Sequence, residues 1–225
     1  MDIQALTDAT ISDLSAAADP KKAGLMAAYM KTDMPFYGVH KAGRTSVLRR
    51  LRREFSPGDA NEYRAAVLGL WQLEHREEKY LALGYARAFD VFVNGESMAL
   101  YERLVTEGAW WDFVDEAATK LIGRVLSEER TATELIVRQW IRSDDMWLRR
   151  TSIICQLAHK EDTDTALLSD ACIANLTDIE FFIRKAIGWA LREYAKTDPD
   201  WVRAFVKTHR DELSGLSYRE ATKHL

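Results

Sequence analysis

Four segments that open with aromatic residues recur at a nearly constant spacing, and this recurrence constrains the fold more than any other feature. They begin at Lys79, Trp110, Met146 and Phe181, so the steps between them are 31, 36 and 35 residues. A further helical segment fits between each pair. Periods of this size with two helices per unit indicate a helical solenoid, in which each unit packs on its neighbours.

Glycine and proline are too scarce for a fold rich in turns. The chain of 225 residues contains 11 Gly and 4 Pro, helix-forming residues fill every long segment, and no convincing alternating strand occurs. The consensus patterns of tetratricopeptide and ankyrin repeats are absent, which leaves loosely similar helix pairs of the HEAT-like type. We therefore expect an all-α fold of HEAT-like helical repeats forming a curved α-solenoid, as a single domain over residues 1–225.

The charge, the cysteines and the N-terminal segment limit the classes of protein to which this chain can belong. The net charge of -4 argues against a protein covered with basic residues. Cys155 and Cys172 are too far apart for a compact metal motif, and the histidines show no metal-ligand spacing, so we expect neither a metal nor a cofactor. No secretory signal follows Met1, and no run of about 18 apolar residues occurs. We expect a cytoplasmic monomer without membrane contact.

The double tryptophan at Trp110-Trp111 divides into two roles on a helical wheel. Trp111 and Asp115 share a face because residues four apart do so. Trp110 falls instead on an apolar stripe, which continues through Phe113, Val114, Ala117, Leu121 and Val125. Trp111 and Asp115 lie at the margin of this stripe. They form either the packed edge of the core with a solvated carboxylate or a binding site for a cationic ligand.

Basic residues stand at matching places in two successive repeat segments. Equivalent helices of a solenoid lie side by side, so residues at these places share one concave wall. The basic residues concerned are Arg149, Arg150, Arg184 and Lys185. Trp111 and Trp189 would interrupt this basic track with aromatic rings, and the acids can occupy the convex side. A basic track with interleaved aromatic residues is typical of a nucleic-acid groove.

A second basic run precedes the repeats and contains no acid. Its members are Lys41, Arg44, Arg49, Arg50, Arg52 and Arg53. Such a run is compatible with a solvated helix face. It is also compatible with an arm that contacts several backbone phosphates.

Several long motifs, taken in order, resemble the AlkD-like DNA alkylation repair glycosylases from about Tyr29 to the last residue. The most specific are Trp110-Trp111-Asp112 with Val114-Asp115, Trp147-Leu148-Arg149-Arg150-Thr151, and the segment from Phe181 to Tyr194. The ending Leu213-Ser214-Gly215-Leu216-Ser217, with Arg219-Glu220-Ala221, is similar as well.

The resemblance implies HEAT-like repeats that hold duplex DNA and excise cationic N-alkylated purines such as 3-methyladenine and 7-methylguanine. By position it implies that Asp115 is the catalytic aspartate, that Trp111 and Trp189 are the paired tryptophans, and that Arg150 contacts DNA. Tyr29 matches a further aromatic residue of the site. Arg149, Arg184 and Lys185 would bind DNA backbone beside Arg150.

The remaining aromatic residues are expected to pack, and a second function stays open. We expect core positions at Trp110, Trp147, Phe181, Ile183 and Ile187, with packing roles for Trp71, Trp140 and Trp201. The alternative to an enzyme is a non-catalytic HEAT-like module that binds duplex DNA or a protein partner along its concave face.

Overall fold

The computed structural model describes residues 1–225 and is helical throughout, without strands. The residues group into two compact units, Met1–Val93 and Asn94–Leu225. The predicted all-helical fold class is confirmed, and the expected single domain stays a prediction. None of the helices combines the length and the apolar character needed to cross a membrane.

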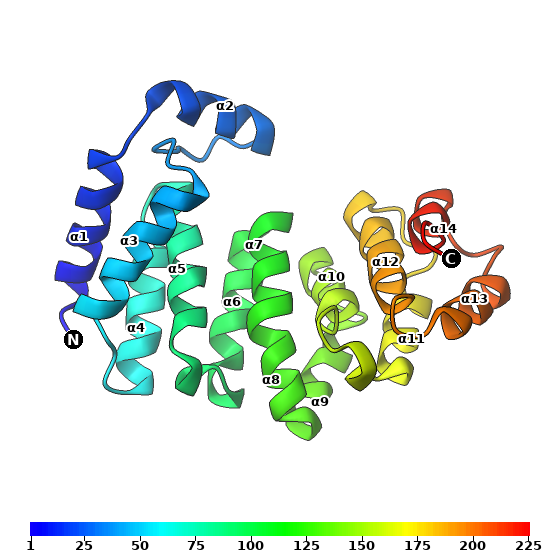
Figure 1. The fold of residues 1–225 in the computed structure, drawn as a ribbon. Coiled ribbons are helices and arrows are strands. Elements are labelled where there is room, and N and C mark those ends of the chain that lie inside the picture. The colour runs from blue at the N-terminus through cyan, green and yellow to red at the C-terminus, as the bar shows by residue number, and fades with distance from the viewer. The chain divides into compact units, whose positions relative to one another are not determined.

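Unit 1 comprises the helices before Val93 (Figure 1). They are α1 (Ile3–Ala16), α2 (Pro20–Met30), α3 (Lys41–Glu54), α4 (Ala60–Trp71), α5 (Arg76–Ala88) and the short η1 (Asp90–Phe92). Their starting points follow from local chemistry. The Asp19 carboxylate accepts a hydrogen bond from the Lys22 N–H, and Pro20 at the first helical position begins α2 without losing an intrahelical bond.

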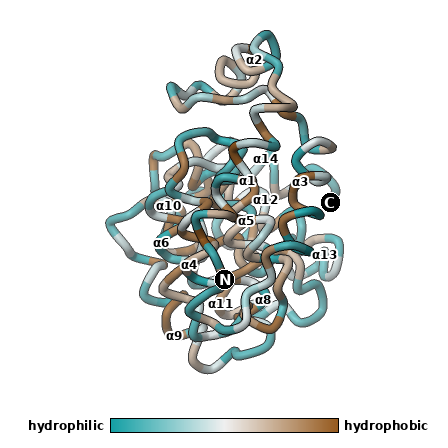
Figure 2. Tube along the Cα trace, turned by 90° about the vertical axis from the view of Figure 1, so that its left-hand side faces the viewer, coloured by the Kyte–Doolittle hydropathy of each residue, from teal (hydrophilic) through white to brown (hydrophobic).

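Helices α1, α3, α4 and α5 pack together, whereas α2 lies apart from them in both views (Figures 1 and 2). Met30 is the single buried residue of α2. The loop after α2 is nevertheless fixed, because the buried Glu77 carboxylate accepts hydrogen bonds from the backbone N–H groups of Tyr37, Gly38 and Val39 at 3.1, 2.8 and 3.0 Å. Three such donors satisfy a buried carboxylate that would otherwise be costly.

Unit 2 comprises the helices after Asn94. They are η2 (Gly95–Ser97), α6 (Met98–Gly108), α7 (Trp111–Glu116), η3 (Ala117–Ile122), α8 (Gly123–Glu128), α9 (Arg130–Trp140), α10 (Met146–Ile154), η4 (Lys160–Asp162), α11 (Thr165–Ile173), α12 (Phe181–Tyr194), α13 (Pro199–Thr208) and α14 (Gly215–Ala221). Each packs mainly on helices that are near in the chain, such as α10 on α9, α11 and α12. This local packing is typical of solenoid-like folds.

The expected core residues of unit 2 are buried except for Phe181 and Trp110. Trp147, Ile183 and Ile187 are buried. Phe181 was expected in the core, but it is 58% exposed. It is the first residue of α12, and the next residue, Phe182, makes the ring contacts with Trp110 and Trp147 instead. One residue of offset turns a helical side chain by about 100°, so one phenylalanine faces inward and the other outward.

Candidate functional site

Asp115 and Arg150 form a two-point ion pair between α7 and α10. Arg150 Nε donates to Asp115 Oδ1 at 2.8 Å, and Nη2 donates to Oδ2 at 2.9 Å. The Arg150 side chain is 4% exposed and that of Asp115 is 17% exposed. Both carboxylate oxygens are thus fixed by one planar guanidinium, and the carboxylate keeps a small accessible edge.

Arg150 also connects this pair to α12. Its Nη1 donates to the backbone carbonyl of Phe182 at 2.5 Å, and its Cζ lies 5.9 Å from the centre of the Phe182 ring. Three of the five N–H groups of the guanidinium are therefore satisfied inside unit 2. The arginine holds three helices in a fixed relation around Asp115.

The environment of Asp115 opposes its ionisation and Arg150 favours it. Burial raises the pKa of Asp115 above its usual value, and Arg150 counters the rise through its hydrogen bonds and its charge. The negative charge of Asp112 adds a smaller rise. A carboxylate that is desolvated in this way interacts more strongly with any positive charge brought against its open edge.

A π-helical turn follows Asp115 directly. Helix α7 ends at Glu116, η3 takes the wider π form over Ala117–Ile122, and α8 continues from Gly123. The hydroxyl of Thr119 donates to the Asp115 carbonyl at 2.7 Å. Such single π turns occur frequently at functional sites, where they shift the register of the residues on either side.

Gly123 permits a close approach between α8 and the C-terminal end of α10. A Cβ atom at this position would lie 2.2 Å from the Cys155 carbonyl oxygen, which is far inside van der Waals contact. His159 joins the same contact, since its Nε2 bonds to the Gly123 carbonyl at 2.8 Å while its Nδ1 is buried without a partner. Burial lowers the pKa of His159, so the ring is held neutral with its proton on Nε2.

Of the two tryptophans predicted for the site, Trp111 stands on α7 with Asp115, and Trp189 stands on α12, which bonds Arg150 through the Phe182 carbonyl. Trp111 is the first residue of α7, one turn before Asp115, and it is half-buried. Trp189 is half-buried on α12, seven residues after Phe182. Seven residues make almost two full turns, so Trp189 shares the Phe182 face about 10 Å further along the axis. The structure therefore places Asp115 and Arg150 in contact, with Trp111 on the helix of Asp115 and Trp189 on the neighbouring α12.

Tyr29 belongs to unit 1, on α2, where it is 76% exposed. It lines an open hollow of about 400 Å³ together with Leu25, Phe36 and Tyr80. The Arg44 guanidinium covers the Tyr80 ring at 4.4 Å. The site role predicted for Tyr29 stays a prediction.

Trp110 is a correction to the expected core. It precedes α7 in an extended conformation and is half-buried rather than part of the helical stripe. Its ring packs edge-on against Phe182 at 5.5 Å and lies 6.3 Å from the Trp147 ring, with its indole N–H buried and without a partner. The stripe itself begins at Phe113, which is fully buried.

The other predicted DNA-binding cations of unit 2 have partners within the unit. Arg149 Nη2 bonds to the Asp178 carboxylate at 3.0 Å, and Arg184 Nε donates to the Asp178 carbonyl at 3.0 Å. Lys185 forms an ion pair with Glu220 at 2.8 Å. Their predicted contacts with DNA stay predictions, and any such contact would compete with these bonds.

Two comparisons with known proteins agree on one family. The family model described as DNA alkylation repair enzyme matches residues 10–225. The chain belongs to this family. The solved structure of a predicted DNA alkylation repair enzyme from Enterococcus faecalis is 33% identical, with a TM-score of 0.85 over 92% of this chain and 96% of that chain. No curated protein matches the chain.

Membership of the DNA alkylation repair enzyme family supports a role in alkylation repair and an enzyme that acts on DNA. Sequence reasoning had not placed Phe182 in the site, although it contacts Arg150 through its carbonyl and its ring. The seven-residue spacing from Phe182 to Trp189 is a signal that could have found it, because both then lie on one helix face.

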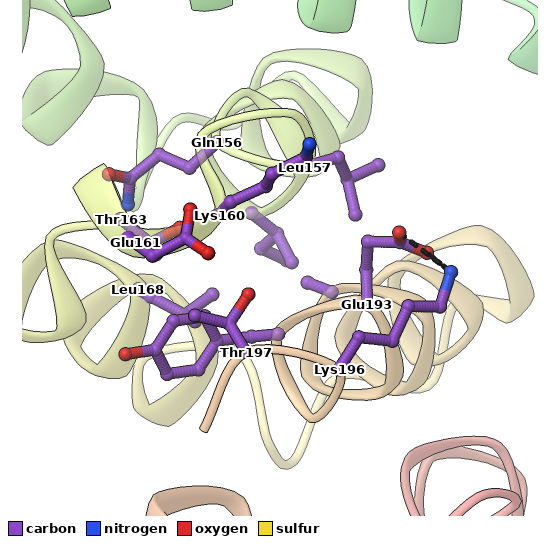
Figure 3. Close-up of a pocket in the computed structure, with 12 residues that line it drawn as sticks. Gln156, Leu157, Lys160, Glu161, Thr163, Leu168, Glu193, Lys196 and Thr197 are labelled. Carbon is purple, nitrogen blue, oxygen red and sulfur yellow. Dashed lines mark hydrogen bonds and ion pairs between the residues drawn. The ribbon is translucent and has the colours of Figure 1, made fainter. Parts of the chain in front are cut away.

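A separate cleft of about 210 Å³ lies between the ends of α10 and α12 and the neighbouring η4 (Figure 3). None of the predicted site residues lines it. Figure 3 shows Lys196 and Glu193 paired at one side of the cleft, at 2.7 Å. No group of three or more His, Cys, Asp or Glu residues is placed to hold a metal ion. The cleft and the Asp115–Arg150 pair are thus two separate features of unit 2.

Proposed function

We propose that this protein is a DNA glycosylase that hydrolyses the N-glycosidic bond of cationic N-alkylated purines, such as 3-methyladenine and 7-methylguanine, in duplex DNA. The observation that carries the proposal is the Asp115 carboxylate, which is oriented by two hydrogen bonds from Arg150 and keeps an accessible edge. Its family acts in alkylation repair. We also propose that the protein acts in the cytoplasm as a monomer.

One carboxylate suffices for this chemistry. Alkylation at a ring nitrogen gives the purine a positive charge, so the base leaves without being protonated by a general acid. Positive charge then develops on the sugar, as in other glycoside hydrolyses. Asp115 stabilises that charge through its fixed position and orients or deprotonates the attacking water.

Arg150 and the tryptophans support Asp115 in different ways. Arg150 keeps the carboxylate ionised against the effect of burial. Its two N–H groups that bond neither Asp115 nor Phe182 are the ones that would reach a DNA phosphate. Trp111 and Trp189 offer aromatic faces to the cationic nucleotide, each contact stabilising it by about 0.5–2 kcal/mol. A neutral purine lacks both the charge and the leaving ability, so discrimination follows from the same features.

The test is release of 7-methylguanine from methylated duplex DNA by the wild type and by Asp115→Asn. Asparagine has nearly the same shape and leaves one acceptor oxygen for Arg150, but it carries no charge. We expect release to fall by about 10²-fold or more, as when a group that stabilises transition-state charge is removed. Asp112→Asn is the matched control, since it removes a neighbouring charge from the same helix, and its release should stay within about twofold of the wild type, as expected of a change that leaves Asp115 and its hydrogen bonds intact.

Circular dichroism and binding of undamaged duplex verify that Asp115→Asn is folded. Equal release by the wild type and a folded Asp115→Asn would remove Asp115 from the mechanism. Absence of release by the wild type, with DNA binding retained, would favour the non-catalytic binding module instead.

A further inference from the structure

Three arginines share one face of the last turns of α3. Arg49, Arg52 and Arg53 are three and four residues apart, which places them on the same side of the helix. All three are exposed. Together with Ala88 and Phe89 at the end of α5, they line an open hollow of about 390 Å³. We call these three residues the α3 arginine patch.

The charges of the patch are almost unneutralised. The side chains of Arg49 and Arg52 make no hydrogen bond or ion pair, and Arg53 reaches only Glu54, at 3.3 Å. The neighbouring Arg50 differs, because it bonds Asp13 at 2.5 Å and Glu54 at 3.0 Å. Like charges one turn apart destabilise a helix. The clustering therefore destabilises α3. It occurs in a protein whose overall net charge is negative, at -4.

A purely structural role accounts for only part of this arrangement. Cations are favoured in the last turn of a helix, where backbone carbonyls lack partners. Arg52 and Arg53 lie in that turn of α3, which ends at Glu54. Arg49 lies a full turn earlier and has no partner that would hold it there. An external anion accounts for all three residues together.

We propose that the α3 arginine patch of unit 1 binds the phosphate backbone of duplex DNA, in addition to the contacts proposed for unit 2. This inference rests on the proposed function, which supplies the polyanion. Duplex DNA carries closely and regularly spaced negative charges, and exposed guanidinium groups match phosphates with two donors each. The patch contacts only phosphates, so it contributes affinity without reading the base sequence.

The experiment measures binding of an undamaged duplex as a function of salt by the triple variant Arg49→Ala, Arg52→Ala, Arg53→Ala. We expect affinity at about 0.1 M salt to fall by at least tenfold. The slope of log K against log salt should become shallower by about 0.9 for each phosphate that the variant no longer neutralises, so by about 2 to 3 in total. Replacing the same three residues with lysine should restore most of the slope, because lysine keeps the charge.

A matched control removes three positive charges elsewhere. Arg103, Arg124 and Arg203 are each paired with an acid one turn away, at 2.6, 2.9 and 2.6 Å. Changing these three to alanine lowers the net charge equally, and affinity should stay within about twofold of the wild type because the patch still neutralises the same phosphates. Equal affinity of the patch variant and this control would overturn the proposal, as would a lysine variant that binds no better than the alanine variant.

Because the duplex is undamaged, this readout does not depend on base release. A wild type that binds DNA through the patch but releases no alkylated purine would overturn the proposed function alone. A wild type that releases the base, with a patch variant equal to its control, would overturn the patch alone.

Discussion

Two arginine sites, one in each unit, are built in opposite ways. In unit 2, Arg150 is buried, and three of its five N–H groups bond the Asp115 carboxylate and the Phe182 carbonyl. In unit 1, Arg49 and Arg52 are exposed and have no partner. A buried arginine with three such bonds fixes geometry and leaves only two N–H groups for a ligand, whereas an exposed and unbonded arginine offers all five. The sequence shows the same residue type in both places, and burial separates the two roles.

The largest expected effect comes from breaking the buried pair. Arg150→Ala leaves the Asp115 carboxylate desolvated and unpaired, so we expect the free energy of unfolding to fall by about 3–5 kcal/mol. Arg49→Ala in unit 1 should change it by less than about 0.5 kcal/mol, because an exposed unbonded side chain stabilises little. Urea denaturation of both variants measures the two values. Similar decreases would contradict the division between a positioning arginine and a ligand-binding one.

A smaller effect is expected from the glycine that brings α8 against α10. Gly123→Ala places a methyl group against the Cys155 carbonyl and should destabilise the protein by about 1–3 kcal/mol through overpacking, as measured by urea denaturation. Gly24→Ala on α2 is the matched control. Nothing lies within 4 Å of its added Cβ, so it should be neutral or stabilising by up to about 1 kcal/mol.

The smallest effect is a pH dependence from His159. Because its pKa is lowered in the folded state, the unfolded chain takes up a proton first as pH falls below about 6.5. The free energy of unfolding therefore keeps its His159 contribution above that pH. Below it, the free energy of unfolding decreases by up to about 1.4 kcal/mol for each pH unit, until the pH reaches the pKa of His159 in the folded protein. Denaturation midpoints between pH 7 and 5 measure the decrease. His159→Gln cannot titrate, so its curve should be flatter, and parallel curves would exclude His159 as the source.

Local periodicity was enough to predict some of these features. Glycine and proline scarcity predicted a helical chain, and the four-residue spacing correctly placed Trp111 and Asp115 on one side of a helix. Local periodicity could not predict contacts between distant segments of the chain. Arg150 was predicted as a DNA contact, and the sequence did not predict that its guanidinium also bonds Asp115, 35 residues earlier. No sequence spacing reveals that two side chains on different helices will meet with matched geometry.

The aromatic corrections have a related cause. Phe181 and Trp110 both lie where a helix begins, at its first residue and immediately before it. A helical wheel defines the direction of a side chain only within the helix. At its start, the path of the preceding loop decides which aromatic residue turns inward.

The spacing of hydrophobic residues in the sequence matches the π turn. Buried hydrophobic residues after Trp111 come in pairs every four residues, and the pairs are Phe113-Val114, Ala117-Ala118, Leu121-Ile122 and Val125-Leu126. In a regular α-helix, each step of four would rotate the stripe by about 40°. The extra residue of the π turn absorbs that drift, so the stripe stays on one side.

The same turn has a consequence for insertions and deletions. Loss of any single residue between Ala117 and Ile122 would let the segment close into a regular α-helix, at little cost in backbone hydrogen bonds. Because a π turn holds one residue more than an α turn, the parts of the chain before and after the deletion would keep nearly the same rotation relative to each other. Asp115 would still face Arg150, whereas loss of one residue from the middle of a regular helix such as α12 would rotate its two ends by about 100° relative to each other. The candidate site is thus less sensitive to a three-nucleotide deletion in this stretch than to the same deletion in α12.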